Sequence, residues 1–140
     1  MSFDIFLVCV DHGSVATFSS SIIKDAFAPF IESRSATSWK LADSLADVWI
    51  GDDEDETDGF MVSRPPGEEH PFWVALLDIM RKSQTVLFWP SAGPEPHAVV
   101  ADAAVIPHMP PDMIEKLGTP ALVTSPAEFL ERINDSEGLD

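Results

Sequence analysis

The sequence predicts a single α+β domain in which a mixed sheet with a central antiparallel meander packs against about four helices. Short runs rich in β-branched and aromatic residues alternate with longer runs at helical spacing, and three short runs follow one another between residues 39 and 63. The length of 140 residues fits one domain with a sizeable core. We expect this domain to span residues 1–134, with residues 135–140 as an acidic C-terminal tail.

The first half of the chain should form strands around one helix. Residues 3–10 (FDIFLVCV) predict a mostly buried strand, followed by a turn at His12 and Gly13. Serines at 19–21 offer N-caps for a helix that Pro29 should disturb in its last turn. Residues 39–41, 47–50 and 59–63 predict the three strands of the meander.

The second half alternates between helices and strands. Pro71 pre-sets a helix over residues 72–83, which is nearly apolar in its first two turns and should pack deeply against the sheet. Strands are predicted at 85–89, 98–101 and 121–124, and a short helix at 112–117 between prolines and Gly118. A capping box at residues 125–128 predicts a final helix over 129–133.

The charge balance restricts the classes of partner. The chain has 24 acidic and 8 basic residues, and its formal net charge is -16. Such a charge repels nucleic-acid backbones and anionic lipid, and no apolar run approaches the ~20 residues that span a bilayer. We therefore expect no direct nucleic-acid binding and no membrane association. The same field would accelerate association with a basic protein.

The acidic segment, residues 51–59 (GDDEDETDG), is the main candidate site. If its Gly59 took the sixth position of an EF-hand loop, Pro65 would occupy the twelfth, where calcium requires a bidentate Glu. We therefore predict no metal site and interpret the segment as an exposed anionic docking surface. A solvated turn without a partner remains the alternative. The carboxylates are Asp52, Asp53, Glu54, Asp55, Glu56 and Asp58.

Three further residues are candidates for the same surface. Glu68 and Glu69 extend it if the loop after the third meander strand folds back toward the same edge. Trp39 and Trp49 flank this part of the meander, and we expect one of them to face outward as an apolar anchor, with Trp49 as the partner-binding candidate.

The sequence contains no assembled catalytic motif. The four histidines lack zinc-type spacing, and His70 is expected to be a surface residue beside Pro71. The lone thiol, Cys9, lies in the most apolar strand and is expected to be inert. We predict no catalytic residues and no cofactor, and the absence of disulfide pairs and of a visible signal peptide favours a cytoplasmic location.

The segments SFDIFLVCV, DGFMVSRPPG and PPDMIEKLGTPALVTSPAEFLERI resemble those of a group of small acidic bacterial proteins, most of them uncharacterised, that span about this whole length. The overall type resembles the immunity proteins of bacterial toxin systems, which are small acidic cytosolic domains that block a cognate toxin. The resemblance implies a non-enzymatic inhibitor that occludes a toxin's basic active-site cleft. Two alternatives stay open: a small metal-dependent hydrolase that uses the acidic segment, and a housekeeping binding domain. The oligomeric state is left open.

Overall fold

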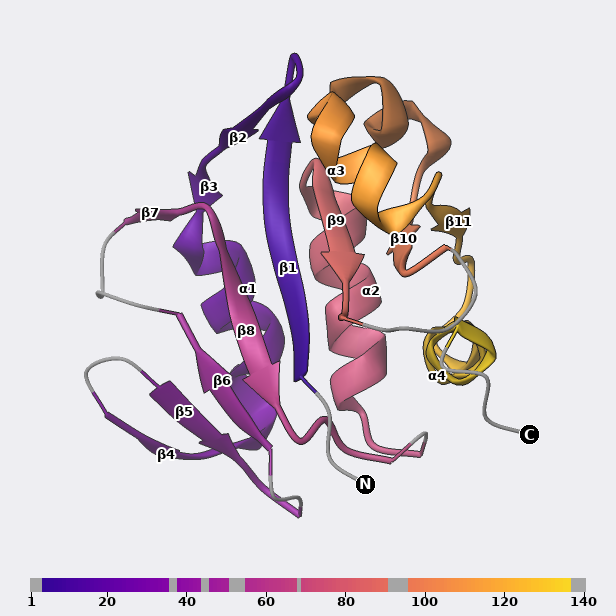
Figure 1. Ribbon diagram of the computed structural model, residues 1–140. Coiled ribbons are helices and arrows are strands. Elements are labelled where there is room, and N and C mark those ends of the chain that lie inside the picture. Colours follow the sequence, from indigo (N-terminus) through magenta and orange to yellow (C-terminus); the bar gives the residue numbers. More distant parts are fainter. Residues whose placement is uncertain are drawn as a thin grey trace.

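The strand β1 (Asp4–Asp11) lies in the middle of a large sheet, between β8 and β9 (Figure 1). The computed structural model describes residues 4–35, 38–43, 46–50, 55–67, 69–90 and 96–136. In these ranges the strand order is β11-β10-β9-β1-β8-β6-β5-β4, and β2 also pairs with β1. The pairs are antiparallel except β10 with β11, so the sheet is mixed, and the predicted α+β class is confirmed.

The predicted central meander is present. Its strands β5, β6 and β8 pair antiparallel in sequence order, and β4 adds a further strand at the edge. The strands after β1 are β2 (Ser14–Ala16), β3 (Phe18–Ser19), β4 (Ile31–Arg34), β5 (Ser38–Leu41), β6 (Asp47–Trp49), β7 (Glu56–Thr57), β8 (Gly59–Ser63), β9 (Thr85–Phe88), β10 (Ala98–Val100) and β11 (Ala121–Leu122).

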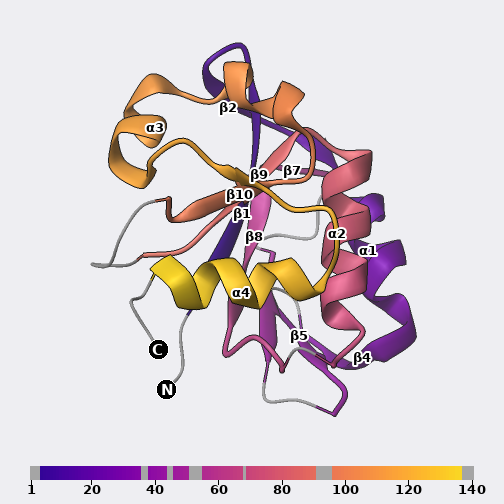
Figure 2. The same ribbon diagram turned by 90° about the vertical axis from the view of Figure 1, so that its right-hand side faces the viewer.

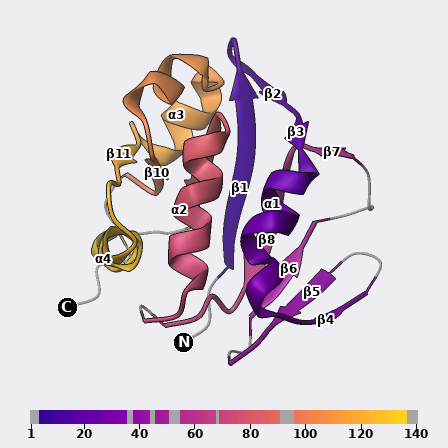
Figure 3. The ribbon, with the colours of Figure 1, turned by 180° about the vertical axis from the view of Figure 1, so that it is seen from behind.

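Helices α1 and α2 cover one face of the sheet, as the side view and the rear view show (Figures 2 and 3). Helix α2 buries Phe72, Trp73, Leu76 and Ile79 almost completely, which confirms the predicted deep packing. Each such side chain contributes about 1.5–3 kcal/mol when buried. The helices are α1 (Ser20–Phe27), α2 (Phe72–Lys82), α3 (Pro111–Leu117) and α4 (Ala127–Ser136), with 3-10 helices η1 (Ala28–Phe30) and η2 (Ala103–His108).

Among the residues that the structure describes, helices cover the opposite face of the sheet at one end only. There η2 and α3 close a second apolar cluster that contains Val10, Val86, Val100 and Val105 (Figure 2). In the described ranges no helix covers this face over β1, β8 and β6, which Figure 1 presents to the viewer. We call this uncovered part the open face.

The prediction that Pro29 disturbs the last turn of the first helix is confirmed, because α1 ends at Phe27 and the 3-10 helix η1 follows it. Other local features differ from the prediction. The strands β2, β3, β4 and β7 were not predicted. Helix α4 continues to Ser136, past the predicted start of the tail, and residues 137–140 lie outside the described ranges.

Candidate functional site

A shallow apolar depression lies on the open face, where β6 leads into the acidic segment. Its volume is about 340 Å³, and its lining includes Phe6, Val8, Trp49, Asp58 and Phe88. Phe6 and Phe88 face each other across β1 and β9, with ring centroids 5.3 Å apart and nearly parallel planes. The depression therefore joins strands from both halves of the sheet.

Trp49 forms one wall of the depression and is 41% exposed, whereas Trp39 on the neighbouring strand is buried. The side chain of Trp49 lies on the open face because alternate residues of a strand point to opposite faces, and Val48 points into the core. Its indole Nε1–H donates a hydrogen bond to Ser63 Oγ over 3.1 Å. This bond orients the ring while leaving its apolar surface accessible. The expectation that one of the two tryptophans faces outward is confirmed.

The second half of the acidic segment is anchored rather than free. The Asp55 carbonyl accepts hydrogen bonds from both the backbone N–H and the hydroxyl of Ser20, over 2.9 and 3.1 Å. Glu56 and Thr57 form β7, which pairs with β3, and the Asp58 carbonyl accepts the Cys9 N–H over 2.7 Å. The side chains of Asp55, Glu56 and Asp58 are exposed, and the backbone that carries them is fixed because its polar groups bond to β1, β3 and α1.

The structure brings some of the predicted surface together. Trp49 and Asp58 line the same depression, and Asp55 and Glu56 lie exposed on the chain that leads to it. Asp52, Asp53, Glu54 and Glu68 lie outside the described residues.

Glu69 lies at the other end of the sheet. The neighbouring His70 ring bonds to the Ala42 carbonyl in the turn between β5 and β6, whereas the acidic segment joins β6 to β8 at their opposite ends. Across five residues of β8 the two ends are about 13 Å apart. The loop that carries Glu69 therefore does not fold back toward the acidic segment.

His70 has a structural role, which corrects the expectation of a surface residue. Its Nδ1 accepts the Phe72 N–H at the first turn of α2 over 3.0 Å, and Nε2–H donates to the Ala42 carbonyl over 2.7 Å. The half-buried ring therefore caps α2 and ties it to the meander. Both bonds together require the neutral imidazole with its proton on Nε2.

Cys9 is buried, as expected from its strand. Burial, reinforced by the carboxylates of Asp11 and Asp58, raises the pKa of its thiol above the ordinary value of 9.0. The thiolate form that a nucleophile requires is therefore disfavoured.

Sequence reasoning missed two features. It did not identify the apolar lining that Phe6, Val8 and Phe88 supply, because the alternation in FDIFLVCV does not reveal whether the second face of a strand is covered. It also treated the histidines as scattered, whereas His12 and His108 lie beside Asp11 at one end of β1.

Comparison with known proteins found no matching family model, no matching curated protein and no matching solved structure. Within the described ranges, none of the helices combines the length and the apolar character that crossing a bilayer requires.

Proposed function

We propose that the protein is an immunity-type inhibitor that binds a basic partner, a toxin domain, through the depression beside Trp49 and the acidic segment. The observation that carries the proposal is an exposed, oriented tryptophan at an apolar depression that an exposed acidic residue, Asp58, also lines. Tryptophan is among the residues most often responsible for binding energy in protein interfaces. The surrounding carboxylates select a cationic partner.

The chemistry of the depression suits an arginine side chain of the partner. A guanidinium can stack on the indole of Trp49 and form a charge-assisted hydrogen bond with the Asp58 carboxylate. Trp49 and Asp58 are both among the residues that line the depression. Its volume, about 340 Å³, lies at the lower end of the roughly 300–1,000 Å³ typical of ligand pockets, which is enough for a few side chains.

Inhibition would result from occupation of a cationic cleft. A toxin that cleaves or modifies an anionic substrate needs positive charge in its cleft, and the exposed carboxylates of Asp55, Glu56 and Asp58 would compete for that charge. Because β7 and the hydrogen bonds to Ser20 hold this backbone in place, little ordering entropy is lost on binding. Association would be fast in low salt and slower once the ~8 Å Debye length of physiological salt screens the charges.

The test is rescue of growth. Products of genes adjacent to the gene for this chain are expressed one at a time, and any that arrests growth is co-expressed with the protein. We expect restored growth, and with purified proteins a stable complex in which the toxin's activity is lost.

Two variants locate the docking surface in that complex. Trp49→Ala should weaken binding by at least about 2 kcal/mol, or roughly 30-fold in Kd. Replacing the six carboxylates of the acidic segment by their amides should lower the association rate by roughly one to three orders of magnitude in low salt and remove most of its salt dependence.

The matched control is Val74→Ala on α2. Val74 is 59% exposed, more than Trp49, but it lies on the helix-covered side of the sheet. The Val74→Ala variant should leave the Kd of the complex with the toxin unchanged. If the Trp49→Ala variant is folded by circular dichroism and binds the toxin with unchanged Kd, the depression is not the docking surface. Failure of every adjacent gene product to bind would count against an immunity role.

A further inference from the structure

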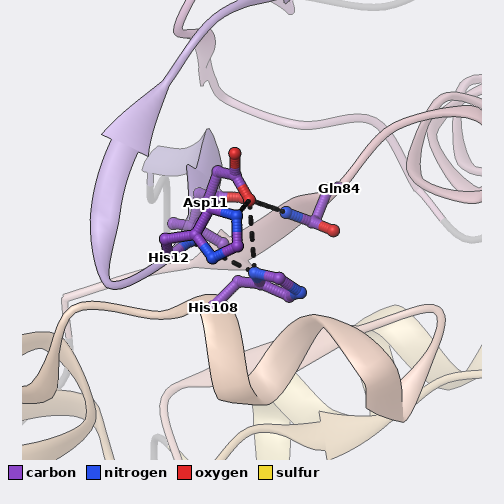
Figure 4. Close-up of polar contacts among 5 residues, drawn as sticks. Asp11, His12, Gln84 and His108 are labelled. Carbon is purple, nitrogen blue, oxygen red and sulfur yellow. Dashed lines mark hydrogen bonds and ion pairs between the residues drawn. The ribbon is translucent and has the colours of Figure 1, made fainter.

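Three side chains with metal-binding atoms, those of Asp11, His12 and His108, meet at the C-terminal end of β1 (Figure 4). Asp11 Oδ1 lies 3.3 Å from His108 Nδ1 and 3.5 Å from His12 Nε2. The two rings contact each other edge to face, with centroids 5.3 Å apart. Each residue offers a ligand atom within 4.8 Å of the other two.

These distances match those between the ligands of a tetrahedral zinc ion. With bonds of about 2.0–2.1 Å to histidine nitrogen and carboxylate oxygen, the ligand atoms of a tetrahedral site lie about 3.3–3.4 Å apart. The two separations from Asp11 Oδ1 are already near that value. The third separation, between the ligand nitrogens of His12 and His108, can be adjusted by rotation of the His12 side chain, which is 85% exposed.

The backbone holds the group in place. His12 and Gly13 form the two-residue turn between β1 and β2, and both have positive φ. The N–H groups of His12 and Gly13 donate to the Nδ1 and the carbonyl oxygen of His108, over 3.1 and 2.9 Å. This turn is therefore docked on the end of η2, although His12 and His108 are far apart in sequence.

Gln84 orients the Asp11 carboxylate through a hydrogen bond. Its Nε2 donates to Asp11 Oδ1 over 3.2 Å and to the Val10 carbonyl over 2.6 Å, as Figure 4 shows for the first of these bonds. An amide fixed in this way orients a ligand carboxylate, as outer-shell residues do in metal sites.

We propose that Asp11, His12 and His108 bind a divalent transition-metal ion, with Zn²⁺ as the best fit. Two imidazoles and one carboxylate are the ligand set that zinc accepts, and three protein ligands leave a fourth position for water or a partner's side chain. Metal binding at His108 Nδ1 would replace the hydrogen bond from the His12 N–H, while the bond from the Gly13 N–H to the His108 carbonyl would still hold the turn on η2. The site lies apart from the depression and does not depend on the proposed inhibitor function.

The test is titration of the full chain with ZnCl₂ by calorimetry, in excess Mg²⁺ to occupy surface carboxylates. We expect one ion per chain, a rise in Tm because the ion links β1 to η2, and with Co²⁺ the intense visible absorption of four-coordinate geometry. His12→Asn should weaken zinc binding by at least about tenfold, since losses of 10–100-fold follow even from outer-shell changes. Asparagine tolerates positive φ and keeps the backbone N–H, so this variant should fold.

Two control variants test whether zinc binds at the three proposed ligands rather than at acidic side chains elsewhere. Asp112→Asn removes one exposed charge on α3 without touching the group, and the six-amide variant of the acidic segment leaves all three ligands intact. Both should bind zinc like the unmodified chain. Absence of one-to-one binding would overturn the proposal, and so would His12→Asn and His108→Asn variants that bind zinc as tightly as the unmodified chain.

Discussion

Gly59 is the position where one added methyl group should have the largest effect on the sheet. It begins β8 beside β1, with φ of 155°. A Cβ built there would lie 1.8 Å from the Leu7 carbonyl oxygen, whereas real Cβ atoms essentially never approach another atom within 3.0 Å. Gly59→Ala therefore requires the two central strands to separate locally by about 1.2 Å.

The cost follows from two terms. A φ of 155° lies outside the regions that L-residues favour and costs an L-residue about 1–3 kcal/mol. Separating the strands adds the loss of the hydrogen bond from Cys9 to Asp58, worth about 1 kcal/mol, and of close packing beneath it. We expect Gly59→Ala to lower the free energy of unfolding by about 3 kcal/mol or more, a large part of the roughly 5–15 kcal/mol typical of a domain.

Two other glycines isolate these terms in urea unfolding followed by tryptophan fluorescence. Gly13 has φ of 80° with open space around its Cβ position, so Gly13→Ala should cost only the backbone term, about 1 kcal/mol. Gly67 has neither feature, and Gly67→Ala should stay within about 0.5 kcal/mol. If Gly59→Ala were no more destabilising than Gly13→Ala, the close approach of β8 to β1 would be refuted.

Three further predictions concern single side chains. Because Cys9 is buried, its thiol should react with a disulfide reagent at pH 8 only as fast as the protein unfolds, and fast labelling in native buffer would contradict the buried position. Hydrogen bonds from Thr124 lower the pKa of Glu128 below its ordinary 4.5; the stability that it contributes is therefore present above that pH and lost as pH falls through the lowered pKa. Glu128→Gln should accordingly unfold more easily than the unmodified chain at pH 7 but equally at pH 2, and a constant difference across that range would be the contrary result. His70→Ala should cost about 1–2 kcal/mol by removing the bond to Phe72, with partial rescue by His70→Asn, which keeps a capping acceptor.

The elements with strong local signals were predictable from the sequence. Pro71 followed by an apolar run gave the start of α2, and the prolines before Asp112 with Gly118 after Leu117 bracketed α3. Phe18 and Ser19, or Glu56 and Thr57, carry no such signal, because a two-residue strand exists only through its partner. Their pairing depends on β1 and α1 being in place.

The candidate site was predictable only where its features have a local sequence signal. The exposed carboxylates and an outward tryptophan follow from charge crowding and from the half-exposed character of a meander. That Phe88 joins Phe6 on the open face requires the strand order, which no local pattern contains. The meeting of His12 with His108 likewise depends on how η2 folds back over the end of β1.

The central place of β1 makes the assembly of the chain cooperative. Apart from its hairpin partner β2, its neighbours lie far along the chain, since Val8 pairs with Gly59 and Phe6 with Phe88, so both long-range closures carry a large loop entropy. Strands β8, β6, β5 and β4 lie on one side of β1 and β9, β10 and β11 on the other, and β1 alone hydrogen-bonds to both groups in the described sheet. The depression takes Trp49 from one group and Phe88 from the other. A partner that recognises it would bind only chains whose folding is complete, and a half-folded chain would present no competing version of the surface.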